Sequence, residues 1–192
     1  MSCAGLFQGQ TAQCPPLGVG LVQRLFLANY DDIVRPFTYD VTDDNLVTAI
    51  AMKAGKVFYE FEGIKQSLSA QAESVSKPYS VTFKSIIDFS VFEVDAASRR
   101  NLEAMSTQKL VAITFGANDS TFGNGAFEIH GSDAGLDLIT LVRINADAET
   151  GGGYRIQLST PDAGGIEKHL PLPLWDTDYD TTLAALVALK TA

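Results

Sequence analysis

The sequence predicts a mainly β protein: an antiparallel β-sandwich or barrel with one flanking helix and a short C-terminal helix. Apolar and polar residues alternate with a period of two in several segments, most regularly over residues 81–91, as in strands that bury one face. Clusters of Gly, Asn, Asp and Pro separate these segments, as turns do. Helical patterns follow only Asp95 and Asp180, so the sequence predicts about nine strands and two short helices.

The length of 192 residues and the apolar content of 46% suit one domain with a substantial core. We expect an N-terminal arm over residues 1–18, a β-sandwich domain over residues 19–175 and a C-terminal helical extension over residues 176–192. Residues 63–77 are polar and Ser-rich and fit neither the helical nor the strand period, which predicts a long arm or loop. We interpret this segment as an extended hairpin that leads into the next strand.

The charge balance limits the partners. A net charge of −9 and a pI near 4.6 argue against a protein that holds nucleic acid by neutralising phosphates, which needs clustered Lys and Arg. An acidic surface instead suits a wall past which DNA passes without specific binding. We expect no membrane partner, because the chain has no apolar run long enough to cross a bilayer and its N-terminus lacks the pattern of a signal peptide.

The chemical motifs predict no catalytic site, no metal site and no cofactor. Cys3 and Cys14 lack the spacing of a zinc or redox motif, and we expect free thiols. The two histidines, His130 and His169, are too few for a metal site without carboxylates. Residues 176–180 carry three aspartates but lack the glycine and the closing glutamate of a calcium loop. We therefore expect a protein that is not an enzyme.

The first strands follow from apolar patterning and turn chemistry. Residues 21–30 predict a strand with Leu21, Leu25 and Leu27 on one side. Residues 45–52 and 56–62 are two β-rich runs around the short link 53–55, which contains glycine, and this pattern is typical of a hairpin.

Residues 81–91 organise the rest of the chain, because they predict a strand of about a dozen residues where 5–6 is usual. Period-two geometry places one set of apolar residues toward the core: Val81, Phe83, Ile87, Phe89 and Val91. The opposite row should face water or a water-filled channel, because a lone Lys or Asp is costly to bury. This row is Thr82, Lys84, Asp88 and Ser90.

The C-terminal half continues the alternation of strands and turns. Asp95 should cap a helix through Leu102 and Met105. Strands are predicted over residues 109–115, 126–130, 135–144 and 154–159, and Leu136, Leu138, Val142 and Ile144 should share one face. Two prolines place residues 169–175 at a sheet edge or in a crossover. Asp180 should cap the last helix, whose apolar residues need cover from the sandwich or from another subunit: Leu183, Leu186, Val187 and Leu189.

Several segments together resemble a known group of proteins. They are RLFLANYDDI, GKVFYEFEG, the long strand leading into DAASRRNLEAM, AFEIHGSDAGLDL and DAETGGGYRIQLSTP, and they cover most of residues 20–160. These segments resemble virion structural proteins of tailed phages and prophages of Bacteroidetes bacteria. The strand–helix–strand pattern also resembles the tail tube superfamily, whose members form hexameric rings that stack into a tube around the DNA path.

The resemblance implies a place for each segment. Residues 95–105 would be the flanking helix, and residues 56–62 and 81–91 would belong to the inner sheet, with the polar row toward the lumen. Residues 63–77 would be the inter-subunit arm, with Gly63, Ile64, Gln66, Ser67 and Lys77 as candidate contacts. The resemblance implies that the chain binds itself and other tail or virion proteins, and that it is part of the virion tail after assembly in the cytoplasm of the host bacterium.

Two alternatives stay open at this point. The proline-rich HLPLPLW and the last helix have no counterpart in the tail tube superfamily, which leaves the roles of head decoration, tail terminator or connector. A hydrolase or carbohydrate-binding module on the same fold is a further hypothesis, with Tyr154, Trp175 and Tyr179 as candidate exposed aromatics.

Overall fold

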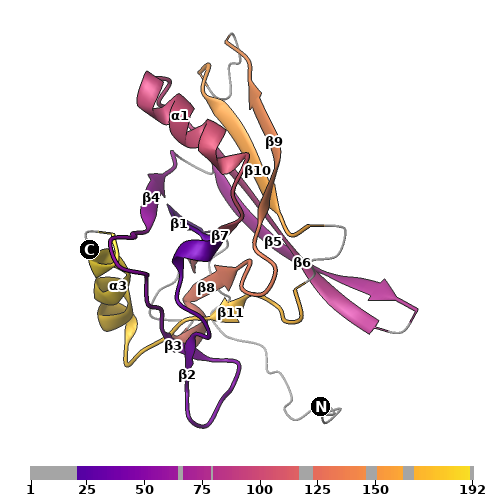
Figure 1. Cartoon of the computed structure of the whole chain (residues 1–192), viewed down its shortest axis with the longest axis vertical. Coiled ribbons are helices and arrows are strands. Elements are labelled where there is room, and N and C mark those ends of the chain that lie inside the picture. The colour runs from indigo at the N-terminus through magenta and orange to yellow at the C-terminus, as the bar shows by residue number, and fades with distance from the viewer. Residues whose placement is uncertain are drawn as a thin grey trace, which may run out of the picture.

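The protein is described here from a computed structural model that covers residues 21–64, 67–78, 80–116, 123–145, 151–161 and 167–190. The predicted N-terminal arm and Gln66 lie outside the described residues. Within them the chain forms strands β1 to β11, helices α1 and α3 and two short 3-10 helices (Figure 1). The bounds are β1 Leu21–Asn29, η1 Tyr30–Asp32, β2 Thr38–Tyr39, β3 Val47–Ala49, β4 Tyr59–Glu62, β5 Leu68–Lys77, β6 Ser80–Val91, α1 Ala96–Met105, β7 Leu110–Gly116, η2 Gly123–Gly125, β8 Phe127–His130, β9 Asp137–Arg143, β10 Tyr154–Ser159, β11 Leu172–Pro173 and α3 Tyr179–Ala188.

The strands form two main antiparallel sheets and one small ribbon. A five-stranded sheet has the order β11-β8-β7-β1-β4, and a four-stranded sheet has the order β5-β6-β10-β9. Strands β2 and β3 pair with each other as a two-stranded ribbon, and Val47 of β3 also bridges to Leu174. In the part of the chain that the structure describes, each main sheet has two edge strands, so the fold is a sandwich with flanking helices rather than a closed barrel. The predicted mainly β class is confirmed.

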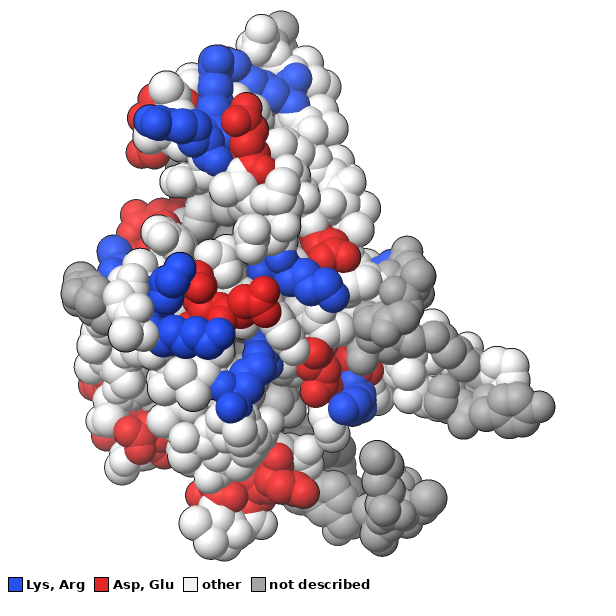
Figure 2. Space-filling view, viewed as in Figure 1, with Lys and Arg blue, Asp and Glu red and all other residues white. Residues whose placement is uncertain are grey.

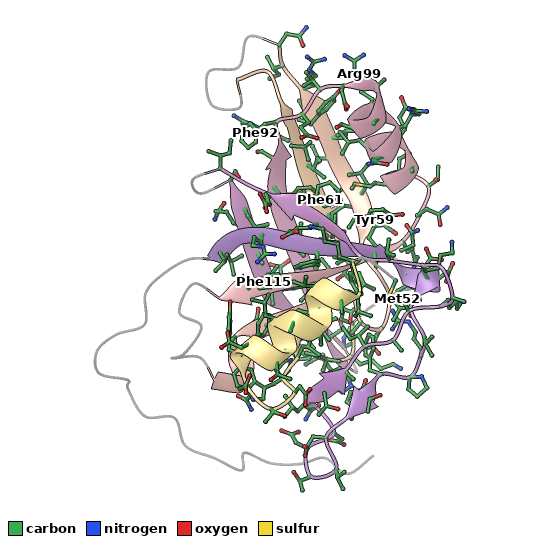
Figure 3. The ribbon with its side chains drawn as sticks, turned by 90° about the vertical axis from the view of Figure 1, so that its left-hand side faces the viewer. Met52, Tyr59, Phe61, Phe92, Arg99 and Phe115 are labelled. Carbon is green, nitrogen blue, oxygen red and sulfur yellow. The ribbon has the colours of Figure 1, made fainter. Side chains whose placement is uncertain are left out.

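The five-stranded sheet is the middle layer, because its central strands bury side chains on both faces. In β1, Leu25 and Leu27 join one apolar cluster, while Phe26 and Ala28 join the other. The first cluster lies between the two sheets and is closed by Leu102 and Met105 of α1. The second lies under α3 and the segment that contains β2 and β3, and the quarter-turned view shows α3 lying across this side, with Phe115 nearby (Figure 3).

Both helices begin where an aspartate accepts a hydrogen bond from the first turn. Asp95 accepts from the Ser98 amide at 2.7 Å, as predicted. In α3 the cap is Asp178, which accepts from the Thr181 amide at 2.7 Å, so the assignment of this role to Asp180 was wrong. Asp180 lies inside the first turn, where its negative charge interacts favourably with the helix dipole. Leu186 is buried in the cluster under α3, and Leu183 and Leu189 pack against it, so the sandwich covers these three residues, whereas Val187 is 40% exposed.

The hairpin predicted around Gly55 does not form. The local turn exists, with the Lys56 amide donating to the Lys53 carbonyl at 3.0 Å and Gly55 at a φ of 71°. Its flanking strands pair elsewhere, however, β3 with β2 and β4 with β1. Phe58, between the turn and β4, is buried in the cluster under α3. Burial of this ring separates the two runs that the turn chemistry alone would have paired.

Strand β9 changes its facing part-way along. Leu138 lies opposite Leu158 and Thr140 lies opposite Gln157, so Ile139 is an extra residue in the ladder. This irregularity puts Leu141 opposite the buried Ile156 and turns Val142 outward, opposite Arg155. The prediction that Leu138 and Val142 share one face was therefore wrong.

The long strand β6 has the predicted alternation, but the core covers only part of it. Ile87 and Phe89 are buried, whereas Val81 is 59% exposed, so its predicted core position was wrong. Strand β10 pairs with β6 only from Ile86 to Val91, and the rest of β6 pairs with β5 in a projecting hairpin (Figure 1). The odd-numbered face of that hairpin lies beyond the apolar core.

This division of β6 predicts opposite effects for two apolar residues of the same row. Phe89→Ala should lower the free energy of unfolding by about 3–5 kcal/mol, because it leaves a cavity beside Phe61, whose ring centroid is 5.6 Å away. Val81→Ala should cost less than about 1 kcal/mol, because only strand preference is lost. Urea denaturation measures both, and equal costs would contradict the boundary of the core.

Candidate functional site

The candidate site is the outer face of the four-stranded sheet, opposite the inter-sheet core. The row Thr82, Lys84, Asp88 and Ser90 lies on this face, and each of the four is half-buried among its neighbours. Ile86 interrupts the row with an apolar side chain. Both described helices pack elsewhere, α1 on the inter-sheet core and α3 on the far side of the five-stranded sheet. Neither described helix therefore covers this face.

Charges on this face are arranged in opposite-sign neighbours. Glu73 lies across the strand pair from Lys84, and the Gln157 amide donates to the Asp88 carboxylate at 2.8 Å. Arg155 lies opposite Ser90, two residues before Gln157 on β10 and on the same face. The face therefore carries a near balance of charge, and the acidic excess of the chain lies elsewhere. Figure 2 shows acidic side chains over the segment between β2 and β3, where Asp40, Asp43 and Asp44 lie.

A shallow depression of about 250 Å³ lies on the same face. Its polar lining comes from three strands and the approach to β5: Ser67, Asp88, Ser90, Thr140, Arg155 and Gln157. Two members of the predicted polar row, Asp88 and Ser90, thus belong to one surface feature with residues that the sequence pattern did not connect to them.

The predicted arm divides into a fixed base and a projecting end. At the base, the Gly63 amide donates to the Gln23 carbonyl at 2.8 Å, and the Ser67 hydroxyl accepts from the Ile64 amide at 2.9 Å. A Cβ on Gly63 would meet the Ser67 hydroxyl at 2.4 Å, so a larger residue there would displace this hydroxyl from its bond to Ile64. Ile64 is 58% exposed. These residues anchor the connection to β1 and are not the projecting part.

The projecting end is formed by β5 and β6 themselves. Leu68 is buried and Ala70 packs on the core, but residues 71–74 and Ser76 of β5 are exposed. Lys77 ends β5, next to the turn at the tip of the hairpin. The projecting arm therefore begins after Ala70 and not at Gly63. It also includes the first half of β6, which pairs with this part of β5.

The free edge of β9 is the feature that the sequence prediction missed. Among the described strands β9 ends the four-stranded sheet, and Ile139 is 55%, Val142 42% and the following Ile144 55% exposed. Arg143 is engaged with the Gly152 carbonyl at 2.9 Å and the ring of Tyr154. An apolar edge strand is a site for pairing with another chain. The run of apolar residues at both parities in LITLVRI was the available signal.

The edges of the five-stranded sheet are less suited to pairing. Strand β11 has two residues and contains Pro173, which cannot donate a ladder hydrogen bond. Strand β4 has four residues, and its Glu60 is held by Arg24 and Lys190, each at 2.5 Å. Short strands and engaged charges limit edge-to-edge contacts.

The buried polar groups hold the fold together. Glu167 is 2% exposed, and its carboxylate accepts from the Ser132 hydroxyl and from the amides of Asp133 and Ala134 at 2.9–3.0 Å. Its carbonyl accepts from the Phe83 amide at 3.0 Å. Glu167 thus ties the turn after β8 to the base of the hairpin.

The structure also shows the surroundings of a histidine and of the three aromatic residues that the sequence analysis considered as functional groups. Within the described ranges, no three His, Cys, Asp or Glu side chains come together as a metal site. His130 is buried and pairs with the Thr114 hydroxyl at 3.0 Å. Tyr154 packs on the inter-sheet core, while Trp175 and Tyr179 pack on the cluster under α3, so these three aromatics do not form one exposed platform.

In comparisons with known proteins, no family model, no curated protein and no solved structure matched this chain. Neither described helix is long and apolar enough to cross a bilayer. A function for this chain therefore has to be argued from its sequence and from the geometry of the described residues.

The outward row and the core row of β6 should separate in a mutational test. Lys84→Ala should change the free energy of unfolding by no more than about 1 kcal/mol, because a surface charge pair contributes little. Circular dichroism melting compares this variant with Phe89→Ala, which should melt far lower. A large loss of stability in Lys84→Ala would contradict the outward facing of the row.

His130 should make stability depend on pH. Burial lowers the pKa of His130 from the ordinary 6.5 to about 4. Below pH 6.5 the unfolded chain binds a proton that the folded chain refuses until about pH 4, so stability is lost over this window as pH falls. The loss should reach about 3 kcal/mol.

Urea unfolding at pH 7 and pH 4.5 measures this contribution. His130→Gln should flatten the pH dependence, while the exposed His169→Gln should retain the slope of the unmodified protein. An unchanged slope in His130→Gln would show that other groups carry the pH dependence.

Proposed function

We propose that this protein is a phage tail tube subunit that assembles into stacked rings around the DNA path. The observation that supports the proposal best is the four-stranded sheet with an apolar free edge at β9 and a long free edge at β5. Unpaired backbone donors and acceptors on both edges can be satisfied by neighbouring copies. The segment resemblance described above favours the same class of protein.

The two edges are different surfaces, so a contact between them joins copies head to tail. Such heterologous contacts form a ring when the rotation between neighbours closes. Strand β9 of one copy would pair with β5 of the next, and the four-stranded sheets would join into one wall. The outward row of β6 would then line one side of this wall, which we assign to the lumen.

The charge pattern of the outer face suits a channel for DNA. Glu73 and Asp88 are matched by Lys84 and Arg155, and the remaining groups of the face are mostly neutral and polar. A surface of this kind lacks the cluster of cations that holds phosphates, and the net charge of −9 adds long-range repulsion. DNA would pass without being retained.

The projecting hairpin suits contacts between rings. From Ser80 to Lys84, strand β6 pairs with β5, and its one other backbone pairing among the described residues is the bridge of Phe83 to Glu167. Val81, near the tip of the hairpin, is exposed. An exposed apolar residue on a two-stranded projection can be buried against a neighbouring copy. Contacts of this kind would stack one ring on another.

A connector, terminator or head decoration protein is the alternative in the same class. The added layer of α3 on the five-stranded sheet favours it, because the tail tube superfamily supplies no counterpart for this helix. A single ring without stacking, or a low copy number in the virion, would identify a terminator or connector. Tubes and a high copy number support the tail tube.

The edge of β9 provides the direct test. Val142→Glu should leave folding intact, because Arg155 lies opposite and supplies a counter-charge. It should abolish assembly, because the interface would have to bury the charge. Negative-stain electron microscopy and analytical ultracentrifugation at high protein concentration measure rings and tubes.

Val41→Glu is the matched control, because Val41 is fully exposed in the segment between β2 and β3, away from both edges. It should assemble like the unmodified protein. Assembly of Val142→Glu, or an unmodified protein that stays monomeric at high concentration, would exclude the proposed edge contact.

A further inference from the structure

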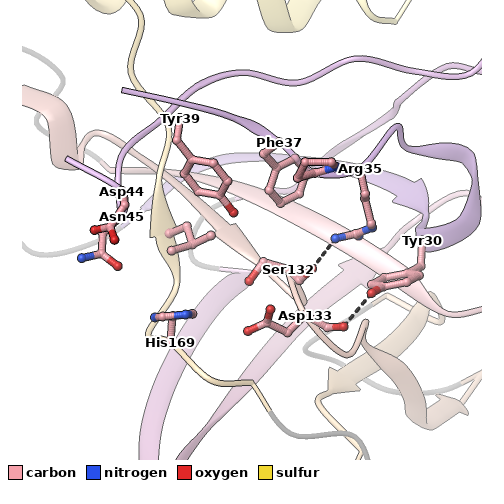
Figure 4. Close-up of a pocket in the computed structure, with 11 residues that line it drawn as sticks. Tyr30, Arg35, Phe37, Tyr39, Asp44, Asn45, Ser132, Asp133 and His169 are labelled. Carbon is pink, nitrogen blue, oxygen red and sulfur yellow. Dashed lines mark hydrogen bonds between the residues drawn. The ribbon is translucent and has the colours of Figure 1, made fainter. Parts of the chain in front are cut away.

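A second surface feature lies away from the four-stranded sheet. It is a pocket of about 250 Å³ between the segment that leads from η1 through β2 to β3, the turn after β8 and the approach to β11 (Figure 4). Tyr30, Arg35, Tyr39, Asn45, Asp133 and His169 contribute to its lining. The lining includes no residue of β5, β6, β9 or β10, so assembly through those strands would not use it.

Arg35 is the unusual group of this pocket. The centre of its guanidinium lies 3.7 Å from the ring centroid of Tyr30, and one nitrogen, Nη1, donates to the Ser132 carbonyl. The other two nitrogens, Nε and Nη2, are buried and have no hydrogen-bond partner within the described residues. Buried donors without an acceptor are costly and rare. Because these two nitrogens are buried, Arg35 contributes to the pocket mainly through a positive charge that the Tyr30 ring and the Ser132 carbonyl hold in place.

The polar wall opposite is fixed before any ligand arrives. The Glu167 carboxylate holds Ser132, Asp133 and Ala134 through three hydrogen bonds. The Asp133 carboxylate accepts from the Lys168 amide at 2.9 Å, and its carbonyl accepts from the Tyr30 hydroxyl at 2.6 Å. A site supported in this way loses little entropy when it binds.

The lining mixes donors and acceptors in nearly equal measure. Asn45 and the Tyr39 hydroxyl supply donors, Asp44 and Asp133 supply carboxylate acceptors, and His169 also contributes to the lining. Tyr39 is 37% exposed, and its ring meets Phe37 edge-on with centroids 6.4 Å apart. Burial, and then the negative charge of Asp133, raise the pKa of the Tyr39 hydroxyl.

We propose that this pocket binds a neutral saccharide ring. Hydroxyl groups both donate and accept, so they match a lining that offers both, and a sugar ring can lie against an aromatic side chain such as Tyr39. The carboxylates of Asp44 and Asp133 disfavour an anion. Drug-sized ligands occupy about 300–1,000 Å³, so the smaller volume here suits a single ring.

The pocket would give the protein a contact with glycans in addition to its role in assembly. The ligand could be a free monosaccharide or the end of a glycan chain, because both present the same hydroxyls. This inference does not depend on the proposed tail function, since the two surfaces share no residue.

The test is titration of the ¹⁵N-labelled full chain with glucose, galactose, mannose and N-acetylglucosamine, followed by NMR. At least one sugar should shift the Asn45 side-chain amide and the backbone amides of Ser132 and Asp133. Tyr39→Ala and Asp44→Asn should each weaken binding by about tenfold or more, because each removes a direct contact. A glycan array separates a chain end from a free sugar by its retention of the labelled protein.

Tyr59→Ala is the matched control, because Tyr59 is an exposed tyrosine on β4, distant from the pocket lining. Its binding should equal that of the unmodified protein. Glycine, lysine and glutamate are titrated in parallel. Shifts with these amino acids alone, no shift with any neutral sugar, or a sugar response that survives Tyr39→Ala would each overturn the proposal. An unchanged spectrum outside the pocket verifies that each variant is folded.

Discussion

The burial of the five-stranded sheet on both faces is the constraint on which the rest of the structure depends. Strand β7 is buried over six consecutive residues, from Leu110 to Phe115, and β1 is buried over four. A sheet of this kind needs a cover on each side, because burial of apolar area is the main favourable term in folding. The four-stranded sheet with α1 supplies one cover, and α3 with the β2–β3 segment supplies the other.

This constraint decides where the described helices lie. Because both of them cover the middle sheet, neither covers the outer face of the four-stranded sheet, whose described side chains are mostly polar. The same sheet has the exposed apolar edge at β9 and the hairpin that projects beyond the core. Glu167 connects the two surface features: its backbone carbonyl accepts from Phe83 at the base of that hairpin, and its carboxylate accepts from the turn that forms a wall of the Arg35 pocket.

The candidate site could be predicted only in part. The outward row of β6 followed from alternation alone, because side chains on a strand must point to opposite faces. The free edge of β9 could not be predicted, because an edge is defined by the absence of a neighbour in the sheet order. The Arg35 pocket was equally hidden: its members come from residues 30–45, 132–133 and 169–172, which only the fold brings together.

The sequence by itself determined the mainly β class, the long strand β6, the cap at Asp95 and the edge position of the proline-containing β11. Each depends on a period, a local hydrogen bond or a missing amide, which are properties of a few neighbouring residues. The tertiary structure decided that β3 and β4 separate, that Ile139 shifts the facing of β9 and that Val81 lies beyond the core. These three features depend on which distant strand pairs with each segment and on where the opposite layer of the sandwich ends. Neither can be predicted from residues that are close in sequence.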